Sequence, residues 1–195
     1  MIQRAEKTAA KSTYVNGHVD RTRRYYLADL ETFPSEDGYR YEIIEGELIV
    51  TPAPGRAHGA VATRLSDLIH AALTRTQWSY IGQPINLEIE SEETTYHCEP
   101  DMSIFDQPVE AIVGDDSIFP VIVIEIVSPG NPNNDYVRKV GAYASLGIPE
   151  YWIVDPRNRA ITFLTLEDKT YQQIDRSVRL PDFNLPLEEL FAGLP

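Results

Sequence analysis

The sequence predicts an α/β fold in which a mixed β-sheet is flanked by helices. The main observation is the stretch 121–154, where an apolar strand, a helix and a second apolar strand follow one another. Two strands joined in this way are typically parallel, with a right-handed crossover. An amphipathic helix over about 57–74 and several alternating strands add helical cover and antiparallel pairs.

The first half of the chain supplies one long helix between strands. Its apolar positions repeat with helical spacing, at Val61, Leu65, Leu68, Ile69 and Leu73. Partial alternation around Gly46 indicates a β-hairpin. In order, we predict a short helix over 26–33, a hairpin over 41–50, a helix over 57–74, and strands over 78–90 and 96–105.

The second half contains the most buried strand. Residues 121–127 are almost continuously β-branched, which is typical of a strand covered on both faces. We predict a strand there, a helix over 133–146, strands over 150–155 and 160–166, and one more strand within 171–195. Gly147 is suited to end the helix. No internal repeat is present, and 195 residues suit one domain of ordinary size.

Residues 1–24 differ from the rest of the chain in charge. They hold six Lys and Arg against two acidic residues, a balance of +4, whereas the whole chain carries −13. We expect a flexible basic tail, acting either as a weak electrostatic handle for nucleic acid or as a solvated arm. The overall acidity argues against nucleic acid as a partner, because it repels phosphates at long range.

The remaining composition indicates a soluble protein of the cytoplasm. One cysteine, Cys98, excludes an intramolecular disulfide and fits a reducing compartment. The longest apolar run, 118–127, contains a proline and a glutamate and is shorter than the roughly 20 residues of a membrane span. No secretory signal is recognisable at the N-terminus.

Three acidic residues interrupt predicted strands where apolar side chains are expected: Glu45, Asp101 and Glu125. A buried carboxylate is costly unless it is paired or binds a cation, so each is either a hydrogen-bonded structural group or a ligand. Neighbouring strands that carry Asp101 and Glu125 would bring together hard oxygen ligands, which suit Mg²⁺ or Mn²⁺.

A lysine follows this candidate metal site on the next predicted helix. Lys139 and Tyr143 stand four residues apart and share a helix face. A lysine that returns over the end of a metal-bearing strand could bind a phosphate or help to activate water. The alternative is an ordinary lysine on an exposed helix position.

Several motifs together resemble the Uma2 family of restriction-endonuclease-like proteins. They are Tyr41-Glu-Ile-Ile-Glu-Gly-Glu-Leu48, His58 at a helix start, Pro100-Asp101, Glu125-Ile-Val-Ser-Pro129, then Asp135, Lys139 and Tyr143, and Gly147-Ile-Pro-Glu-Tyr-Trp-Ile-Val-Asp-Pro156. The last string is the most specific. The resemblance covers about residues 25–190 and implies that 25–195 form a single Uma2-like nuclease domain with the PD-(D/E)xK fold.

The resemblance also implies an activity, which is Mg²⁺-dependent endonucleolytic cleavage of phosphodiester bonds in nucleic acid, with DNA as the expected substrate. Asp101 and Glu125 resemble the metal ligands, and the carbonyl of Ile126 would complete the protein ligands. The lysine of the motif is expected at Val127, and Lys139 on the following helix takes its place. Glu45 resembles the upstream acidic residue that supports the metal or its water.

Other features of the resemblance stay open. His58, Tyr143 and Asp155 occupy patterned positions without an assigned role. A homodimer would supply two sites for a double-strand cut. Two alternative functions remain, which are a non-catalytic binding or regulatory module that keeps the fold and a metal-dependent hydrolase of small phosphate esters. Convergence of Asp101, Glu125 and Lys139 would argue against the first, and an open cleft would argue against the second.

Overall fold

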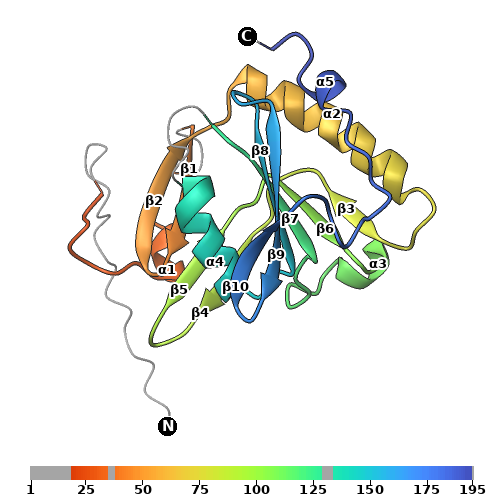
Figure 1. Cartoon of the computed structure of the whole chain (residues 1–195). Helices are drawn as coiled ribbons and strands as arrows, with labels where there is room; N and C mark the ends of the chain where they lie inside the picture. Colours follow the sequence, from red (N-terminus) through yellow and green to blue (C-terminus); the bar gives the residue numbers. More distant parts are fainter. Residues whose placement is uncertain (1–18, 35–37, 129–133, 195) are drawn as a thin grey trace.

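The computed structural model describes residues 19–34, 38–128 and 134–194, and the description of the fold is confined to them (Figure 1). Ten strands and six helical segments follow in the order α1 (Leu27–Leu30), β1 (Tyr39–Ile44), β2 (Glu47–Pro52), α2 (Arg56–Leu73), β3 (Ser79–Ile81), β4 (Leu87–Glu90), β5 (Thr95–Cys98), β6 (Met102–Phe105), α3 (Val109–Ile112), β7 (Ile122–Ile126), η1 (Asn134–Arg138), α4 (Lys139–Ser145), β8 (Glu150–Asp155), β9 (Ala160–Glu167), β10 (Thr170–Ile174) and α5 (Leu187–Leu190).

The strands form two sheets. The larger has the order β10-β9-β8-β7-β6-β3, and the smaller has the order β2-β1-β5-β4. Strands β7 and β8 are parallel, as predicted for the strand–helix–strand unit, and the other pairs of the larger sheet are antiparallel. The larger sheet is therefore mixed, and the predicted α/β class with flanking helices is confirmed.

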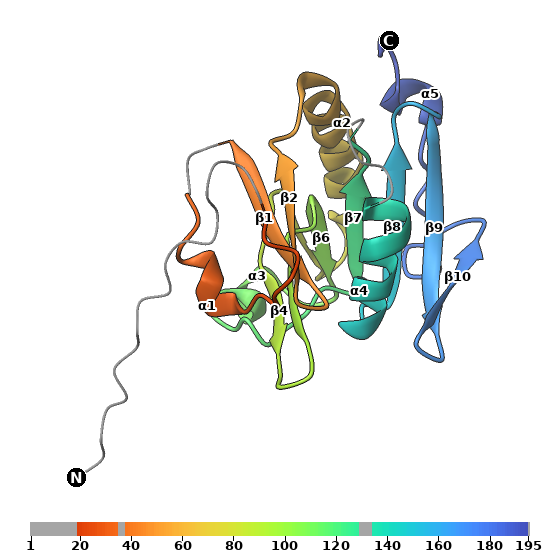
Figure 2. The same cartoon turned by 90° about the vertical axis from the view of Figure 1, so that its left-hand side faces the viewer.

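The two faces of the larger sheet are covered by different elements (Figure 2). Alternate residues of β7, namely Ile122, Ile124 and Ile126, pack in one core with the apolar side of α2. Val123 and Val127 pack on the opposite side with α4 and with residues of the smaller sheet. Position 125 therefore faces the layer between the two sheets.

The prediction of long single strands over 78–90 and 96–105 is wrong, because the chain crosses between the sheets within each of them. Strands β3 and β6 belong to the larger sheet, whereas β4 and β5 belong to the smaller one. Pro84 lies in the first crossing and Pro100 in the second. Proline has no N–H to donate to a strand ladder, so both positions favour a break.

The helix predicted over 133–146 consists of two parts. Its first residue lies outside the described residues, Asn134–Arg138 form the π-helical turn η1, and α4 continues to Ser145. Gly147 has a φ of 73°, a left-handed conformation that glycine adopts without strain, and it ends the helix as predicted. Single π-helical turns are frequent at functional sites.

The predicted basic tail lies mostly outside the described residues, of which the first is Val19. The last residues of that tail contact the domain. Arg23 forms an ion pair of 2.7 Å with Asp29, and Arg24 donates a hydrogen bond to the carbonyl of Glu93. No helix among the described residues has both the length and the apolar character that crossing a membrane requires.

Candidate functional site

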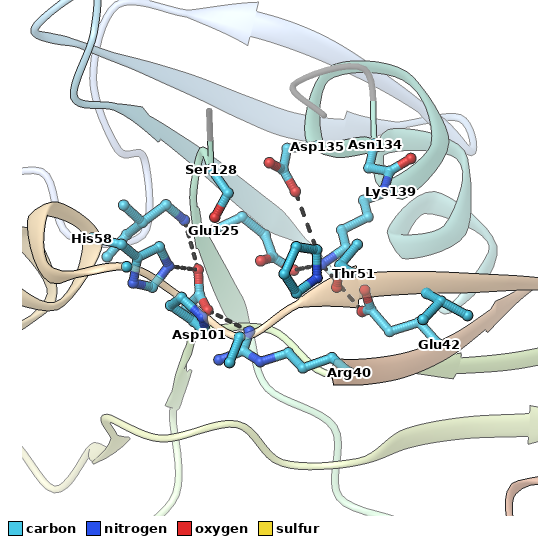
Figure 3. A pocket seen from close by; sticks show the side chains of 16 residues that line it. Arg40, Glu42, Thr51, His58, Asp101, Glu125, Ser128, Asn134, Asp135 and Lys139 are labelled. Atoms are coloured by element: carbon cyan, nitrogen blue, oxygen red, sulfur yellow. Dashed lines mark hydrogen bonds and ion pairs between the residues drawn. The ribbon is translucent and has the colours of Figure 1, made fainter. Parts of the chain in front are cut away.

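A cavity of about 400 Å³ lies at the end of β7 (Figure 3). Its walls come from β1, the segment between β2 and α2, the β5–β6 crossing, and η1 with the start of α4. Its polar lining consists of Arg40, Glu42, Thr51, His58, Asp101, Glu125, Ser128, Asn134, Asp135 and Lys139. Asp101, Glu125 and Lys139, all predicted from the sequence, therefore line a single cavity, to which Ile126 also contributes.

Glu125 reaches this cavity because of its position in the β7 alternation. It is 2% exposed and lies on the face toward α4. Its Oε1 accepts hydrogen bonds from Lys139 Nζ at 2.8 Å and from the Tyr143 hydroxyl at 2.5 Å. Burial and the surrounding carboxylates raise the pKa of Glu125 well above its ordinary value, although Lys139 opposes the shift. Tyr143 thus orients this carboxylate.

Asp101 lies at the β5–β6 crossing and is held by three donors. Its Oδ1 accepts from Arg40 at 2.7 Å, and its Oδ2 lies 2.8 Å from His58 Nε2 and 2.9 Å from the backbone N of Ile126. Burial alone would raise the pKa of Asp101, but His58 and the charges of Arg40 and Lys139 outweigh burial and hold it below its usual range. Asp101 is therefore an ionised, fixed carboxylate.

Lys139 is buried at 5% exposure, so the alternative of an exposed helix lysine is wrong. Its Nζ lies 2.8 Å from Glu125, 3.1 Å from Glu42 and 3.9 Å from Asp135. Burial disfavours the ammonium, but these carboxylates outweigh burial and raise the pKa of Lys139 well above its ordinary value. Lys139 is therefore a buried ammonium group surrounded by three carboxylates.

Glu45 does not belong to the cavity. It is exposed in the β1–β2 turn with a φ of 55°. The upstream acid of the cavity is Glu42, which is 1% exposed and accepts a hydrogen bond of 2.9 Å from the backbone N of Glu99. The alternation of β1 already indicated this residue, because Glu42 shares a strand face with Ile44, which packs in the core between the two sheets.

The corrected position of this acid can be tested by a matched pair of substitutions. Glu42→Ala should lower the free energy of unfolding by about 1–3 kcal/mol, because the partly buried Glu99 N–H would lose its acceptor. Glu45→Ala should stay within about 0.5 kcal/mol of the wild type, since Glu45 is exposed. Urea unfolding measures both. Equal effects of the two substitutions would contradict the assignment.

Of three further motif residues, two contact the carboxylates of the site and one lies away from the cavity. His58 lines the cavity and contacts Asp101, and Tyr143 contacts Glu125. Asp155, at the end of β8, instead accepts hydrogen bonds from the backbone of Arg157 at 2.9 Å and from the side chain of Asn158 at 3.0 Å. Asp155 therefore caps the turn between β8 and β9 and does not line the cavity.

Arg40 and Asn134 also line the cavity, although neither was predicted as a site residue. Arg40 shares its strand face with Glu42, so the alternation of β1 contained a usable signal for it. Asn134 opens the π-helical turn, and no motif or periodicity singled it out. The π-helical turn itself cannot be read from the apolar spacing, because it breaks the helical period.

Acidic groups outnumber basic ones around Lys139. Burial and the charges of Asp101 and Glu42 raise the pKa of Asp135 to about 6, with Lys139 opposing. Glu125 shifts in the same direction. A site whose carboxylates are hard to ionise together gains from an added cation, because the cation favours their charged forms.

The raised pKa of Asp135 gives a pH-dependent prediction. The folded-state pKa of Asp135 lies above its ordinary value of 3.8. The protonated carboxyl therefore contributes its full stability below pH 3.8, and this stability is lost as the pH rises through about 6. Asp135→Asn should therefore stabilise the metal-free protein at pH 8, by up to about 3 kcal/mol, and have little effect near pH 4. Urea unfolding at the two pH values measures this, and a gain independent of pH would contradict it.

The cavity contains carboxylate oxygens, which are the donors that a hard divalent cation takes. Within residues 19–34, 38–128 and 134–194, no group of three or more His, Cys, Asp or Glu side chains is arranged to hold a metal ion. Asp101 and Glu125 nevertheless supply two carboxylates, and Mg²⁺ commonly uses one or two of these together with water. The Ile126 N–H donates a hydrogen bond to Asp101. The N–H and the carbonyl of one strand residue point to the same edge of the strand, so the Ile126 carbonyl is expected on this edge as well.

The mixed sheet and the cavity shared by Asp101, Glu125 and Lys139 agree with the resemblance to restriction-endonuclease-like proteins. The model of the Uma2 family, described as "putative restriction endonuclease", matches residues 27–194. The chain belongs to the Uma2 family. This match confirms the resemblance that the sequence motifs indicated.

A solved structure confirms the fold. The protein is similar to the crystal structure of a putative nuclease belonging to DUF820 from Anabaena variabilis, with a TM-score of 0.63 and 18% sequence identity. The similarity covers 85% of this chain and 97% of that chain. A search of the curated proteins finds no match.

Proposed function

We propose that the cavity is the active site of a Mg²⁺- or Mn²⁺-dependent endonuclease that hydrolyses phosphodiester bonds of nucleic acid, with DNA as the first candidate substrate. The observation that carries the proposal is the convergence of Asp101, Glu125 and Lys139 from three separate elements on one cavity. Membership of the Uma2 family supports nuclease chemistry in general. A non-catalytic module would not require this convergence.

The two carboxylates and the Ile126 carbonyl would hold the cation. When bound, such an ion polarises a phosphoryl oxygen and lowers the pKa of a coordinated water. The chain's own residues prepare the site for it. Arg40 and His58 fix Asp101 in its ionised form, and Tyr143 fixes the rotamer of Glu125.

Lys139 would stabilise the negative charge that develops on the phosphate during the reaction. Val127, where the lysine of the motif is expected, packs in the core between the two sheets, on the same side of β7 as Glu125. Lys139 approaches that side from α4 and contacts Glu125 directly. A lysine from the helix thus meets the same carboxylate that a lysine at 127 would meet.

Cation binding provides the first test of the site. Mn²⁺ or Mg²⁺ should raise the melting temperature, because a ligand that binds only the folded state stabilises it, by about 2.7 kcal/mol at 100 times its Kd. Glu125→Gln should remove this rise, while Glu45→Gln, which changes the charge equally outside the cavity, should retain it. Differential scanning fluorimetry measures the shift. If millimolar metal does not shift the melting temperature of the wild type, the carboxylates form a structural cluster and not a metal site.

A second candidate is a metal-dependent hydrolase of small phosphate esters. A cavity of about 400 Å³ lies within the usual range for small-molecule sites, and the chain carries a net charge of −13. Parallel assays of an oligonucleotide and of 4-nitrophenyl phosphate would separate the two functions. Cleavage of the ester without cleavage of the oligonucleotide would favour this second candidate.

A further inference from the structure

Asn134 places a buried hydrogen-bond donor in the cavity wall. The residue is the first of η1 and is 5% exposed. Its side-chain Nδ2 has no hydrogen-bond acceptor among the described residues, although Asn134 lines the cavity beside Asp135 and Lys139 (Figure 3). A buried N–H group without an acceptor is rare and costs free energy, which indicates a partner that arrives with a ligand.

The basic side chains of the cavity already have partners. Arg40 and His58 are bonded to Asp101, and Lys139 is bonded to Glu125 and lies close to Glu42. The charges of Arg40 and Lys139 are therefore largely balanced by carboxylates of the protein itself. An anionic group that enters the cavity needs a donor that is not held in this way, and the Asn134 amide supplies one.

The chemistry of the donor restricts the ligand. An amide N–H₂ binds an acceptor and repels a cation, so Asn134 Nδ2 is not a metal ligand. If the proposed function holds, a phosphodiester must enter this same cavity to reach Asp101 and Glu125. Its non-bridging oxygens are charged acceptors, for which neutral side-chain amides are common partners in nucleic-acid complexes.

We propose that Asn134 binds a non-bridging oxygen of the substrate phosphate through Nδ2 and so positions the phosphodiester against Asp101 and Glu125. This inference rests on the proposed nuclease function and adds a substrate contact to it. Asn134 Nδ2 forms no hydrogen bond with any described residue, so replacing Asn134 should weaken binding of the substrate and leave the fold intact.

The test measures binding of a fluorescently labelled DNA oligonucleotide by anisotropy, with Ca²⁺ as a hard cation that takes oxygen ligands. Asn134→Ala should weaken binding about 10-fold or more, the effect of losing a hydrogen bond to a charged group. Asn86→Ala, which removes an exposed asparagine outside the cavity, should bind like the wild type. The melting temperature of Asn134→Ala should not fall, whereas a structural asparagine would lower it.

A second oligonucleotide identifies the contacted atom. In a methylphosphonate linkage a neutral methyl group replaces one non-bridging oxygen, so the wild type should lose affinity and Asn134→Ala should lose much less. Equal binding by wild type and Asn134→Ala overturns the inference while the proposed function stands, and so does a loss that is the same on both oligonucleotides. A wild type that binds neither oligonucleotide refutes the proposed function, and the inference falls with it.

Discussion

Lys139→Met should lower the free energy of unfolding by about 3–5 kcal/mol at neutral pH, the usual cost of removing one partner from a buried ionic group. Methionine keeps the apolar stem of lysine and removes the ammonium. Three carboxylates within 3.9 Å of Nζ would then share a buried site without their common cation. Urea unfolding of the metal-free protein measures the loss.

The neighbouring Arg138 provides the control. Its side chain is 46% exposed and pairs at 2.8 Å with Glu47, which is more exposed still. Arg138→Met should cost less than about 1 kcal/mol, as exposed ion pairs usually do. At low pH, where the carboxylates are protonated, the penalty of Lys139→Met should shrink. A stability within 1 kcal/mol of the wild type at neutral pH would show that Lys139 does not hold the acids together.

The centre of the fold could be predicted because its signals are local. The β-branched run of β7, the helix after it and the strand at β8 follow directly along the chain, and the right-handed parallel crossover is nearly obligatory for such a unit. The division into two sheets could not be predicted, since it depends on which distant strand each short segment pairs with. Segments 78–90 and 96–105 each supply one strand to the larger sheet and one to the smaller sheet.

The candidate site could be predicted where a charged residue interrupts a segment in which apolar residues are expected. Glu125 interrupts an apolar run and Asp101 interrupts a predicted strand directly after Pro100, so both signals are local in the sequence. Which upstream acid reaches the cavity depends on the strand register, because adjacent residues of a strand point to opposite faces. Glu42 reaches the cavity from within β1, whereas Glu45 lies in the turn after that strand.

Loss of cleavage on Glu125→Gln is the largest effect that we expect on activity. Glutamine keeps the shape of glutamate and an oxygen that can accept from Lys139 and Tyr143, but it removes the charge. Replacing residues that only support a metal ligand typically costs 10–100-fold, so replacing a ligand should cost at least about 100-fold. Cleavage rates of wild type and variant, compared at equal protein and metal concentration, give this ratio.

If the cavity around Asp101, Glu125 and Lys139 cleaves nucleic acid with the help of a divalent cation, as we propose, a plasmid-cleavage assay should show it. Wild type, Glu125→Gln and Glu45→Gln are incubated with supercoiled DNA and Mg²⁺ or Mn²⁺, with EDTA in parallel. We predict that wild type and Glu45→Gln convert the plasmid to open-circular or linear forms only with metal, and that Glu125→Gln does not. Cleavage by Glu125→Gln at the wild-type rate, or cleavage that persists in EDTA, would contradict the proposed function.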